Sequence, residues 1–333
     1  MNIKSQTRQF AVIAAVSLIS SLSFSSSWAE ETHYPVTIEN CGYKTTFDAA
    51  PTHAVTLSNN ATELMLALGL EDHMAGTSYM ANLTISPEYA GAYKKVPILS
   101  PLVATTEQLI DAEADFVYAG YPDGFSKKRH SREQLQDLGM KTHLNTEGCN
   151  LGKYGFEQLY AEIRTIAKIF NVNDRGEALI EKLSARVAGV EEKLKDVEAI
   201  PVFIFNGGES APRAVLGNTM HSTVVQLAKG ENIFGDMPNR YGTVSWEQIA
   251  ERNPTFIDVF YSGTASGKVV DNPTRDLGDV RISILKSNPA IADTTAVKQD
   301  NFVTIDSVMG QPGPSSVRAL ERLAKAFHPE AFE

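Results

Sequence analysis

The longest amphipathic pattern in the chain predicts one helix from about Asp174 to Val197. Apolar residues recur there every three to four positions, which is the period of one face of an α-helix. They are Leu179, Ile180, Leu183, Val187, Val190, Leu194 and Val197. Asp174 and Glu177 have the spacing of a capping box, and Pro201 bars helix shortly after the end. At about 1.5 Å per residue, such a helix is roughly 36 Å long, enough to run along two lobes.

A similar segment lies on either side of this helix. Thr106-Glu107-Gln108-Leu109 leads through an apolar run to Tyr121, and Trp246-Glu247-Gln248-Ile249 leads through another to Tyr261. Glu107 to Tyr121 and Glu247 to Tyr261 span the same 14 positions. Each segment has the pattern of a short helix, a turn, a buried strand and an aromatic residue at the strand end. We therefore predict an α/β protein in which two Rossmann-like lobes are joined by one long helix, with a ligand cleft between them.

The remaining patterns alternate between strand and helix, which is the order typical of βαβ units. We expect strands at 54–57, 74–77, 202–205, 256–261 and 302–305, and helices at 61–68, 156–170, 221–229 and 315–327. Ser58-Asn59-Asn60 offers helix-capping side chains before the first of these helices. Because ligands of such sheets bind beyond the carboxyl ends of the strands, Asn59, Asn60, Tyr79 and Tyr121 are candidate ligand contacts. Residues 262–273 have the Gly, Ser and Asn-Pro content of a loop.

The N-terminus has the pattern of an export signal. Lys4 and Arg8 precede an apolar and serine run from Phe10 to Phe24, and Ser27-Trp28-Ala29 predicts cleavage before Glu30. An uncleaved membrane anchor is the alternative, which the short, serine-rich run disfavours. We expect a periplasmic protein with an N-terminal lobe at 30–173, the connecting helix at 174–197 and a C-terminal lobe at 198–333.

The charge of the mature chain excludes one class of partner. Removing Lys4 and Arg8 from the 30 basic residues leaves 28 against 40 acidic ones, so the mature charge is about −12. An acidic protein of this kind is not expected to bind nucleic acid or an anionic membrane surface.

Cys41 and Cys149 are the two cysteines of the chain. In an oxidising compartment such a pair is a candidate disulfide, and two buried free thiols are the alternative. A loop of this length would contribute about 4 to 5 kcal/mol to stability in the chain-entropy model.

Motifs of known catalytic sites are absent from the sequence. It has no G-x-S-x-G elbow, no GxGxxG fingerprint, no P-loop and no H-E-x-x-H. The seven histidines lack metal-ligand spacing, although a three-histidine site could still assemble in space. We therefore expect no enzyme activity, no cofactor and no metal site. A secreted enzyme with an unfamiliar active site is the alternative.

Several stretches of the sequence, and the order in which they occur, resemble those of the periplasmic substrate-binding proteins of ABC importers that take up ferric siderophores, haem and cobalamin. They are Ala50-Pro51, Val55-Thr56-Leu57, Thr62-Glu63-Leu64, 67–72, 107–118, Ala228 to Phe234, 244–248 and 287–290, and they span nearly the whole mature chain. Asn40-Cys41-Gly42 and Pro312-Gly313-Pro314 look like the iron-siderophore subgroup. His53 departs from the family pattern, which commonly has Arg before the first strand. This difference does not change the class of protein that the resemblance implies.

The resemblance implies a monomer that captures a ferric siderophore and delivers it to a permease dimer with its ATPase. In this family one Glu on each lobe docks onto permease arginines, and the matching residues are Glu107 and Glu247. Two separated carboxylates suit two guanidinium forks. A Glu in the first turn of a helix also suits the helix dipole, which is the alternative explanation.

We choose the candidate ligand contacts by the chemistry of their side chains. Aromatic rings can cover a flat chelate, and arginines can pair with its carboxylates or catecholates. Lys127-Lys128-Arg129 could also face an anionic ligand, although a solvated helix start is the simpler interpretation. Because haem-binding relatives use a Tyr near Tyr79 as an iron ligand, haem is an alternative ligand, as is cobalamin. The candidate ligand contacts are Asn59, Asn60, Tyr79, Tyr121, Glu209, Arg213, Tyr241, Trp246, Tyr261 and Arg318.

Overall fold

The fold is described from a computed structural model of the chain. It describes residues 30–79, 85–127, 129–261, 264–265, 268–269 and 277–333. The predicted signal peptide and most of the predicted 262–273 loop lie outside these residues. Two short strands within that loop are described, β13 (Thr264–Ala265) and β14 (Lys268–Val269), which pair antiparallel.

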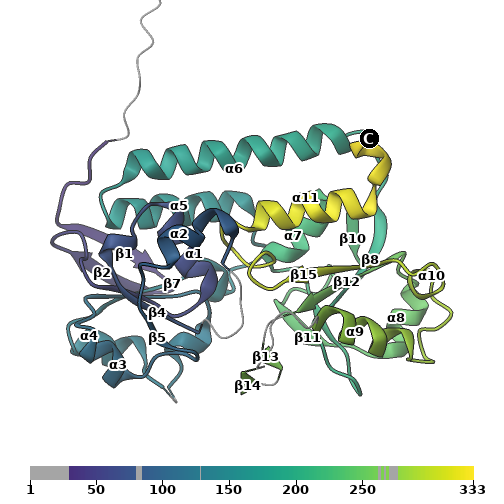
Figure 1. Cartoon of the computed structure of the whole chain (residues 1–333), viewed down its shortest axis with the longest axis horizontal. Coiled ribbons are helices and arrows are strands. Elements are labelled where there is room, and N and C mark those ends of the chain that lie inside the picture. The colour runs from purple at the N-terminus through teal and green to yellow at the C-terminus, as the bar shows by residue number, and fades with distance from the viewer. Residues whose placement is uncertain (1–29, 80–84, 128, 262–263, 266–267, 270–276) are drawn as a thin grey trace, which may run out of the picture.

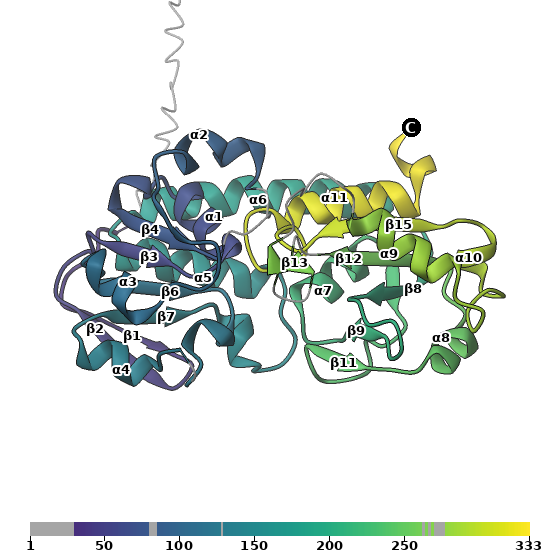
Figure 2. The ribbon, with the colours of Figure 1, turned by 60° about the horizontal axis from the view of Figure 1, so that its bottom comes forward.

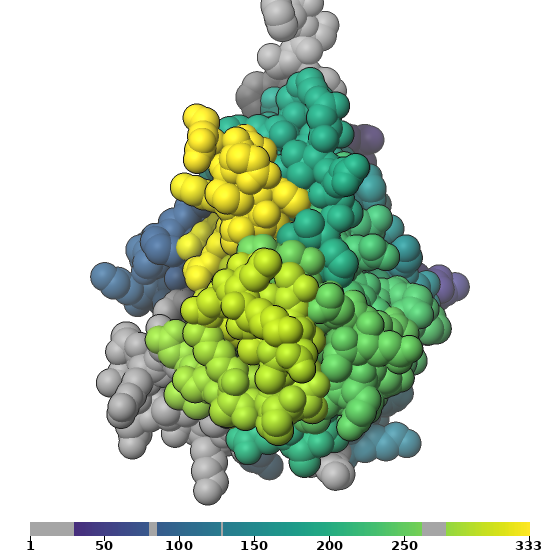
Figure 3. Space-filling model, turned by 90° about the vertical axis from the view of Figure 1, so that its right-hand side faces the viewer, coloured from purple at the N-terminus to yellow at the C-terminus, as the bar shows by residue number. Residues whose placement is uncertain are grey.

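Two lobes lie under one long helix, α6 (Asn173–Leu194), which runs along the top of both (Figure 1). Its buried face carries Leu179, Ile180, Leu183, Val187, Val190 and Leu194. That face packs on α5 (Phe156–Ile169) over one lobe and on α11 (Ser316–Phe327) over the other. Figure 3 shows α6 and α11 side by side at the top of the molecule. The predicted architecture of two α/β lobes joined by one long helix is confirmed.

The two ends of α6 differ from the prediction. The helix ends at Leu194, three residues before Val197, and its N-cap residue, Val172, makes no side-chain cap. Glu177 instead accepts two hydrogen bonds from Arg164 of α5, at 2.7 and 3.0 Å. Asn173 donates to the Glu30 carbonyl and the Thr32 hydroxyl, at 2.6 and 3.1 Å. The predicted capping box is wrong because the helix begins at Asn173, which places Asp174 inside its first turn, and because Glu177 pairs with Arg164.

The N-terminal lobe is built on a parallel five-stranded sheet of order β5-β4-β3-β6-β7. Its strands are β3 (Ala54–Thr56), β4 (Met74–Ser78), β5 (Ile98–Ser100), β6 (Phe116–Ala119) and β7 (Lys141–Leu144). Its helices are α1 (Asn59–Ala67), α2 (Ala90–Tyr93), α3 (Thr106–Asp111) and α4 (Arg132–Asp137). Short 3₁₀ turns lie at Glu71–His73, Pro87–Tyr89, Pro122–Phe125 and Thr146–Cys149.

The C-terminal lobe is built on a mixed sheet of order β11-β9-β8-β12-β15, with β10 paired to β8. Its strands are β8 (Ile200–Phe205), β9 (Arg213–Val215), β10 (Gly230–Asn232), β11 (Tyr241–Thr243), β12 (Phe256–Tyr261) and β15 (Phe302–Asp306). Its helices are α7 (Met220–Leu227), α8 (Trp246–Arg252), α9 (Leu277–Lys286) and α10 (Thr295–Lys298), and a 3₁₀ turn (Pro329–Phe332) follows α11. Figure 2 shows the two sheets in separate lobes.

A hairpin of β1 (Val36–Asn40) and β2 (Tyr43–Phe47) covers the outer edge of the N-terminal lobe. Its turn residue Cys41 forms a disulfide with Cys149, with the Cα atoms 5.3 Å apart. The Asn40 side chain exchanges two hydrogen bonds with the backbone of Leu144, at 2.8 and 2.9 Å. The hairpin is therefore held to β7 and to the turn that follows it.

The start of α1 is fixed by a contact across the sheet. Ser58 is the N-cap residue, but its hydroxyl makes no cap and accepts from the Gly120 backbone N–H at 2.9 Å. A Cβ at position 120 would lie 2.1 Å from Asn60 Oδ1 and 2.2 Å from Ser58 Oγ. Glycine is therefore required where the end of β6 meets α1.

Candidate ligand-binding cleft

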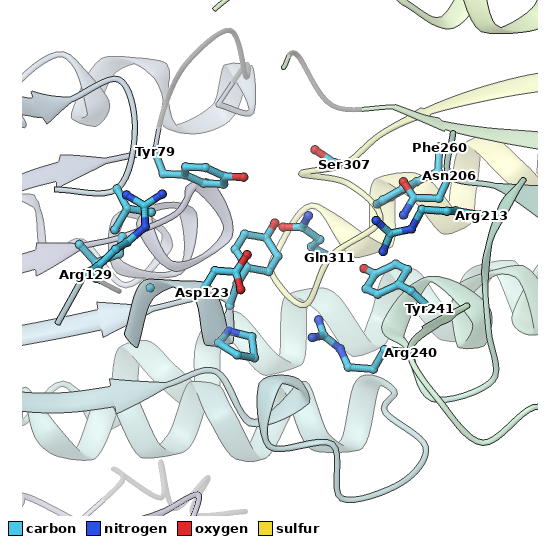
Figure 4. A pocket seen from close by; sticks show the side chains of 15 residues that line it. Tyr79, Asp123, Arg129, Asn206, Arg213, Arg240, Tyr241, Phe260, Ser307 and Gln311 are labelled. Carbon is cyan, nitrogen blue, oxygen red and sulfur yellow. The ribbon is translucent and has the colours of Figure 1, made fainter. Parts of the chain in front are cut away.

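A cavity of about 410 Å³ lies between the two lobes (Figure 4). The N-terminal lobe lines it with Leu57, Tyr79, Val103, Tyr121, Pro122, Asp123, Gly124 and Arg129. The C-terminal lobe lines it with Asn206, Arg213, Arg240, Tyr241, Phe260, Ser307 and Gln311. A ligand held there would contact both lobes at once.

Strand ends place several of these side chains. Leu57 and Tyr79 each follow the last residue of a parallel strand, β3 and β4. In the other lobe Asn206 follows β8 and Ser307 follows β15. The cavity therefore lies at the carboxyl ends of the strands in both lobes, which is where open α/β sheets bind ligands.

Four aromatic rings face the cavity, two from each lobe. Tyr79 and Tyr121 meet edge to face with their ring centroids 6.2 Å apart, and Tyr79 has φ +62°. Burial raises the pKa of Tyr79, with Asp123 adding to the effect and Arg129 opposing it. Burial and then Glu147 raise the pKa of Tyr241 to about 12. These phenols stay protonated at neutral pH, so they can donate hydrogen bonds to a ligand.

Three arginines reach the cavity, and their charges are balanced differently. Arg240 donates to Glu147 Oε1 at 2.6 and 3.1 Å. Burial lowers the pKa of Arg240, but Glu147 and Tyr241 outweigh it and leave that pKa above its ordinary value. Among the residues that the structure describes, Arg129 and Arg213 form no ion pair with a carboxylate. Asp123 is the acidic side chain in the lining, so the described lining carries excess positive charge.

Four of the ten candidate ligand contacts meet in this cavity. They are Tyr79, Tyr121, Arg213 and Tyr241. Asn59 and Asn60 are buried at the start of α1, where Asn60 donates to the Pro312 carbonyl of the other lobe at 3.2 Å.

The other four candidates lie away from the cavity lining. The Trp246 ring is buried in the C-terminal lobe, and its Nε1 donates to the Glu209 carbonyl at 3.0 Å. Glu209 itself is exposed, and Tyr261 is half-buried at the end of β12. Arg318 donates to the Ser86 hydroxyl at 3.0 Å and lines an open groove between the lobes.

Other lining residues were not among the candidates. Asn206 and Ser307 could have been predicted as cavity residues from the sequence, because each lies just after a predicted strand. Arg129 belongs to a run of basic residues that the sequence analysis interpreted as the start of a helix. The described part of that run is a turn, and α4 begins only at Arg132. Arg240 lies before a short strand that the pattern did not predict. The remaining lining residues that were not candidates are Leu57, Val103, Pro122, Asp123, Gly124, Phe260 and Gln311.

Glu107 and Glu247 occupy equivalent places in the two lobes. Each is an exposed residue in the first turn of its helix, α3 or α8 (Figure 1). Thr105 and Ser245 cap these helices, and both caps are complete capping boxes with Gln108 and Gln248. The backbone N–H of each Glu, followed by the capping hydroxyl, lowers the pKa of its carboxyl. Both side chains are therefore anionic at neutral pH.

A family model described as periplasmic binding protein matches residues 55–309, which is more than half of the chain. The chain belongs to the periplasmic binding protein family. Proteins of this family bind small-molecule ligands and work with ABC permeases. They are substrate-binding proteins of the siderophore, haem and vitamin B12 class, as the sequence motifs indicated.

Individual relatives are distant. A vitamin B12-binding protein of Vibrio parahaemolyticus is 25% identical over 200 residues, covering 60% of this chain and 67% of the relative. A periplasmic binding protein from Veillonella parvula has a TM-score of 0.78 at 28% identity, covering 88% of this chain and 97% of that structure.

A third relative is an ABC-type Fe3+-hydroxamate transport system protein from Saccharomonospora viridis. It has a TM-score of 0.73 at 25% identity, covering 89% of this chain and 99% of that structure. Within the described parts of the chain, no helix is long and apolar enough to cross a membrane. The same residues contain no group of three or more His, Cys, Asp or Glu side chains that could hold a metal ion.

Proposed function

We propose that this protein captures an iron chelate of the ferric-siderophore class in the cleft and delivers it to an ABC importer at the inner membrane. The observation that carries this proposal is the pair Arg129 and Arg213, one from each lobe, which line the cavity without a carboxylate partner among the described residues. Guanidinium groups pair with carboxylate and catecholate oxygens, and the four aromatic rings suit the flat faces of such a chelate.

Delivery rests on Glu107 and Glu247. Their equivalent positions on two lobes joined by α6 give two separated, exposed carboxylates. Two such carboxylates can each pair with one arginine of a permease dimer, which would align the cleft between the lobes with the permease. We further propose that the protein is a periplasmic monomer released by cleavage before Glu30.

Haem is the second candidate ligand, because Tyr79 points its phenol into the cavity (Figure 4). A tyrosinate is a known axial ligand of haem iron. Cobalamin is the remaining alternative, since it is the ligand named for a curated relative.

The direct test is to purify the mature protein from its own periplasm and record its native mass and its visible absorbance. A ferric charge-transfer band with the added mass of an iron chelate supports the proposal. A Soret band that is lost in Tyr79→Phe would replace the siderophore by haem, and the mass and spectrum of a corrinoid would replace it by cobalamin. The mass of the free protein also reports whether it is a monomer.

A further inference from the structure

A carboxylate of the N-terminal lobe pairs with one of the three arginines that line the cavity. Glu147 Oε1 accepts from both Nε and Nη2 of Arg240, although Glu147 is not itself part of the cavity lining. Both side chains are largely buried, so water screens the pair only weakly. The positive charge of Arg240 is therefore largely balanced before any ligand enters the cavity.

Glu147 is held in place by contacts other than the one to Arg240. Its Oε2 accepts from the Met220 backbone N–H at 2.7 Å, at the start of α7. Its own backbone N–H donates to Asn145 Oδ1 at 3.1 Å, and the disulfide at Cys149 fixes the same 3₁₀ turn. Moving the carboxylate away from Arg240 would break the bond to Met220, so we expect the pair to persist when a ligand binds.

The pairing also orients the guanidinium of Arg240. Nε and Nη2 form one edge of the planar group, and both donate to Glu147. The side chain of Arg240 points into the cavity (Figure 4). The Nη1 amino group is therefore left to donate to an oxygen atom of a ligand.

Arg129 and Arg213 differ from Arg240 in their charge balance. Both are exposed, and among the residues that the structure describes neither forms an ion pair with a carboxylate. An anionic oxygen of a ligand would be attracted by either of them without a nearby carboxylate bound to the same guanidinium. At Arg240 the same oxygen would also be repelled by Glu147, so an uncharged oxygen is better suited to that position.

We propose that Glu147 is a specificity-determining residue of the cleft, which reserves Arg240 for an uncharged oxygen of the ligand, such as an amide carbonyl, and leaves anionic oxygens to Arg129 and Arg213. A fixed charge gives specificity when it disfavours one ligand more than another. Glu147 therefore limits the negative charge that a chelate can carry without losing affinity. This inference rests on the proposed function, because it concerns the charge of the chelate bound in the same cleft.

The test compares two ferric chelates of different charge, a trianionic tris-catecholate and an uncharged tris-hydroxamate, by calorimetric titration of the purified protein. The readout is the ratio of the two affinities, because a general change in the shape of the cleft weakens both chelates alike. Glu147→Gln removes the negative charge and keeps an oxygen that can accept from Arg240. It is expected to raise the affinity for the tris-catecholate about tenfold relative to the tris-hydroxamate, since Arg240 gains a free charge for an anionic contact.

The matched control is Glu157→Gln, which removes the same charge from an exposed position in the first turn of α5, in the same lobe. Glu157 does not line the cavity, and solvent screens its charge, so the ratio of affinities should stay as in the parent protein.

The double variant Glu147→Gln, Arg240→Gln removes both charges together, so it leaves no buried charge unpaired and serves if the single variant does not fold. It is expected to keep the ratio of the parent protein, whereas Arg213→Gln should lower that ratio about tenfold. An unchanged ratio in folded Glu147→Gln, or a selective loss of the tris-catecholate in the double variant, would overturn the proposal alone. A parent protein that binds neither chelate would overturn the proposed function, and this inference with it.

Discussion

Arg240 of the C-terminal lobe donates two hydrogen bonds to Glu147 of the N-terminal lobe, at 2.6 and 3.1 Å. The other oxygen of Glu147 accepts from the Met220 backbone N–H at 2.7 Å. The carboxylate is 3% exposed and the guanidinium 14%. This ion pair, α6 and the hydrogen bond from Arg318 to Ser86 thus join the lobes at three separate places, which favours small changes of lobe separation over a wide hinge motion.

Glu147→Leu is expected to lower the free energy of unfolding by about 3 to 5 kcal/mol, because it leaves Arg240 buried without a counter-charge. The double variant Glu147→Leu, Arg240→Met should lose less than the single one, since no unpaired charge remains. Chemical denaturation of the three proteins measures this. Equal losses in the single and double variants would show that the ion pair does not act as a unit.

Reduction of the bond between Cys41 and Cys149 is expected to cost about 4 to 5 kcal/mol of stability, since the bond joins residues 108 apart in sequence. Thermal unfolding with and without reductant measures the loss. The double variant Cys41→Ala, Cys149→Ala should match the reduced protein and should not respond to reductant. Two reactive thiols in the unreduced mature protein would contradict the pairing.

The pH dependence of stability follows from Glu63. Its pKa is raised in the folded state, to about 7 from 4.5. The stabilisation is therefore fully present below about pH 4.5 and is lost as the pH rises towards 7, by about 3 kcal/mol in total. Unfolding curves at several pH values should show this decrease in the parent protein and a weaker one in Glu63→Gln. A stability that rises with pH over this interval in both proteins would be inconsistent with it.

Charge reversal at the two exposed glutamates should separate binding from delivery. Glu107→Arg with Glu247→Arg is expected to abolish uptake in cells while leaving ligand affinity unchanged, because neither side chain lines the cavity. Reversal of Glu251, which lies one turn after Glu247 on the same helix, is the control and should keep uptake. Uptake that survives the double reversal would remove the docking role of Glu107 and Glu247.

Sequence periodicity was sufficient for the architecture, because the long helix and the repeated segment both follow from local patterns of apolar residues. Local patterns failed where a side chain had a better partner in the tertiary structure. Glu177 pairs with Arg164 instead of capping α6, and the Ser58 hydroxyl binds the Gly120 backbone instead of capping α1.

The residues that line the cleft could be predicted from the sequence only in part, because local patterns place strand ends but not irregular connections. Tyr79 and Tyr121 follow strands, so their place at the sheet edge was readable from the sequence. Arg129 and Arg240 lie on irregular connections whose direction depends on packing between elements that are distant in the chain. Trp246 has the chemistry of a cleft residue, but its ring packs on Phe205 inside the lobe with the centroids 6.1 Å apart.

The most direct measurement is a titration of the purified mature protein with an anionic ferric tris-catecholate, compared with haem and cobalamin. We expect saturable binding of the ferric chelate, weakened about tenfold or more by each of Arg129→Ala and Arg213→Ala, because each removes a charge-assisted contact. Arg164→Ala changes a surface arginine that pairs with Glu177 and does not line the cavity, so it should have no effect. Binding of the ferric chelate that is insensitive to both cleft arginines, or preferential binding of haem or cobalamin, would contradict the account.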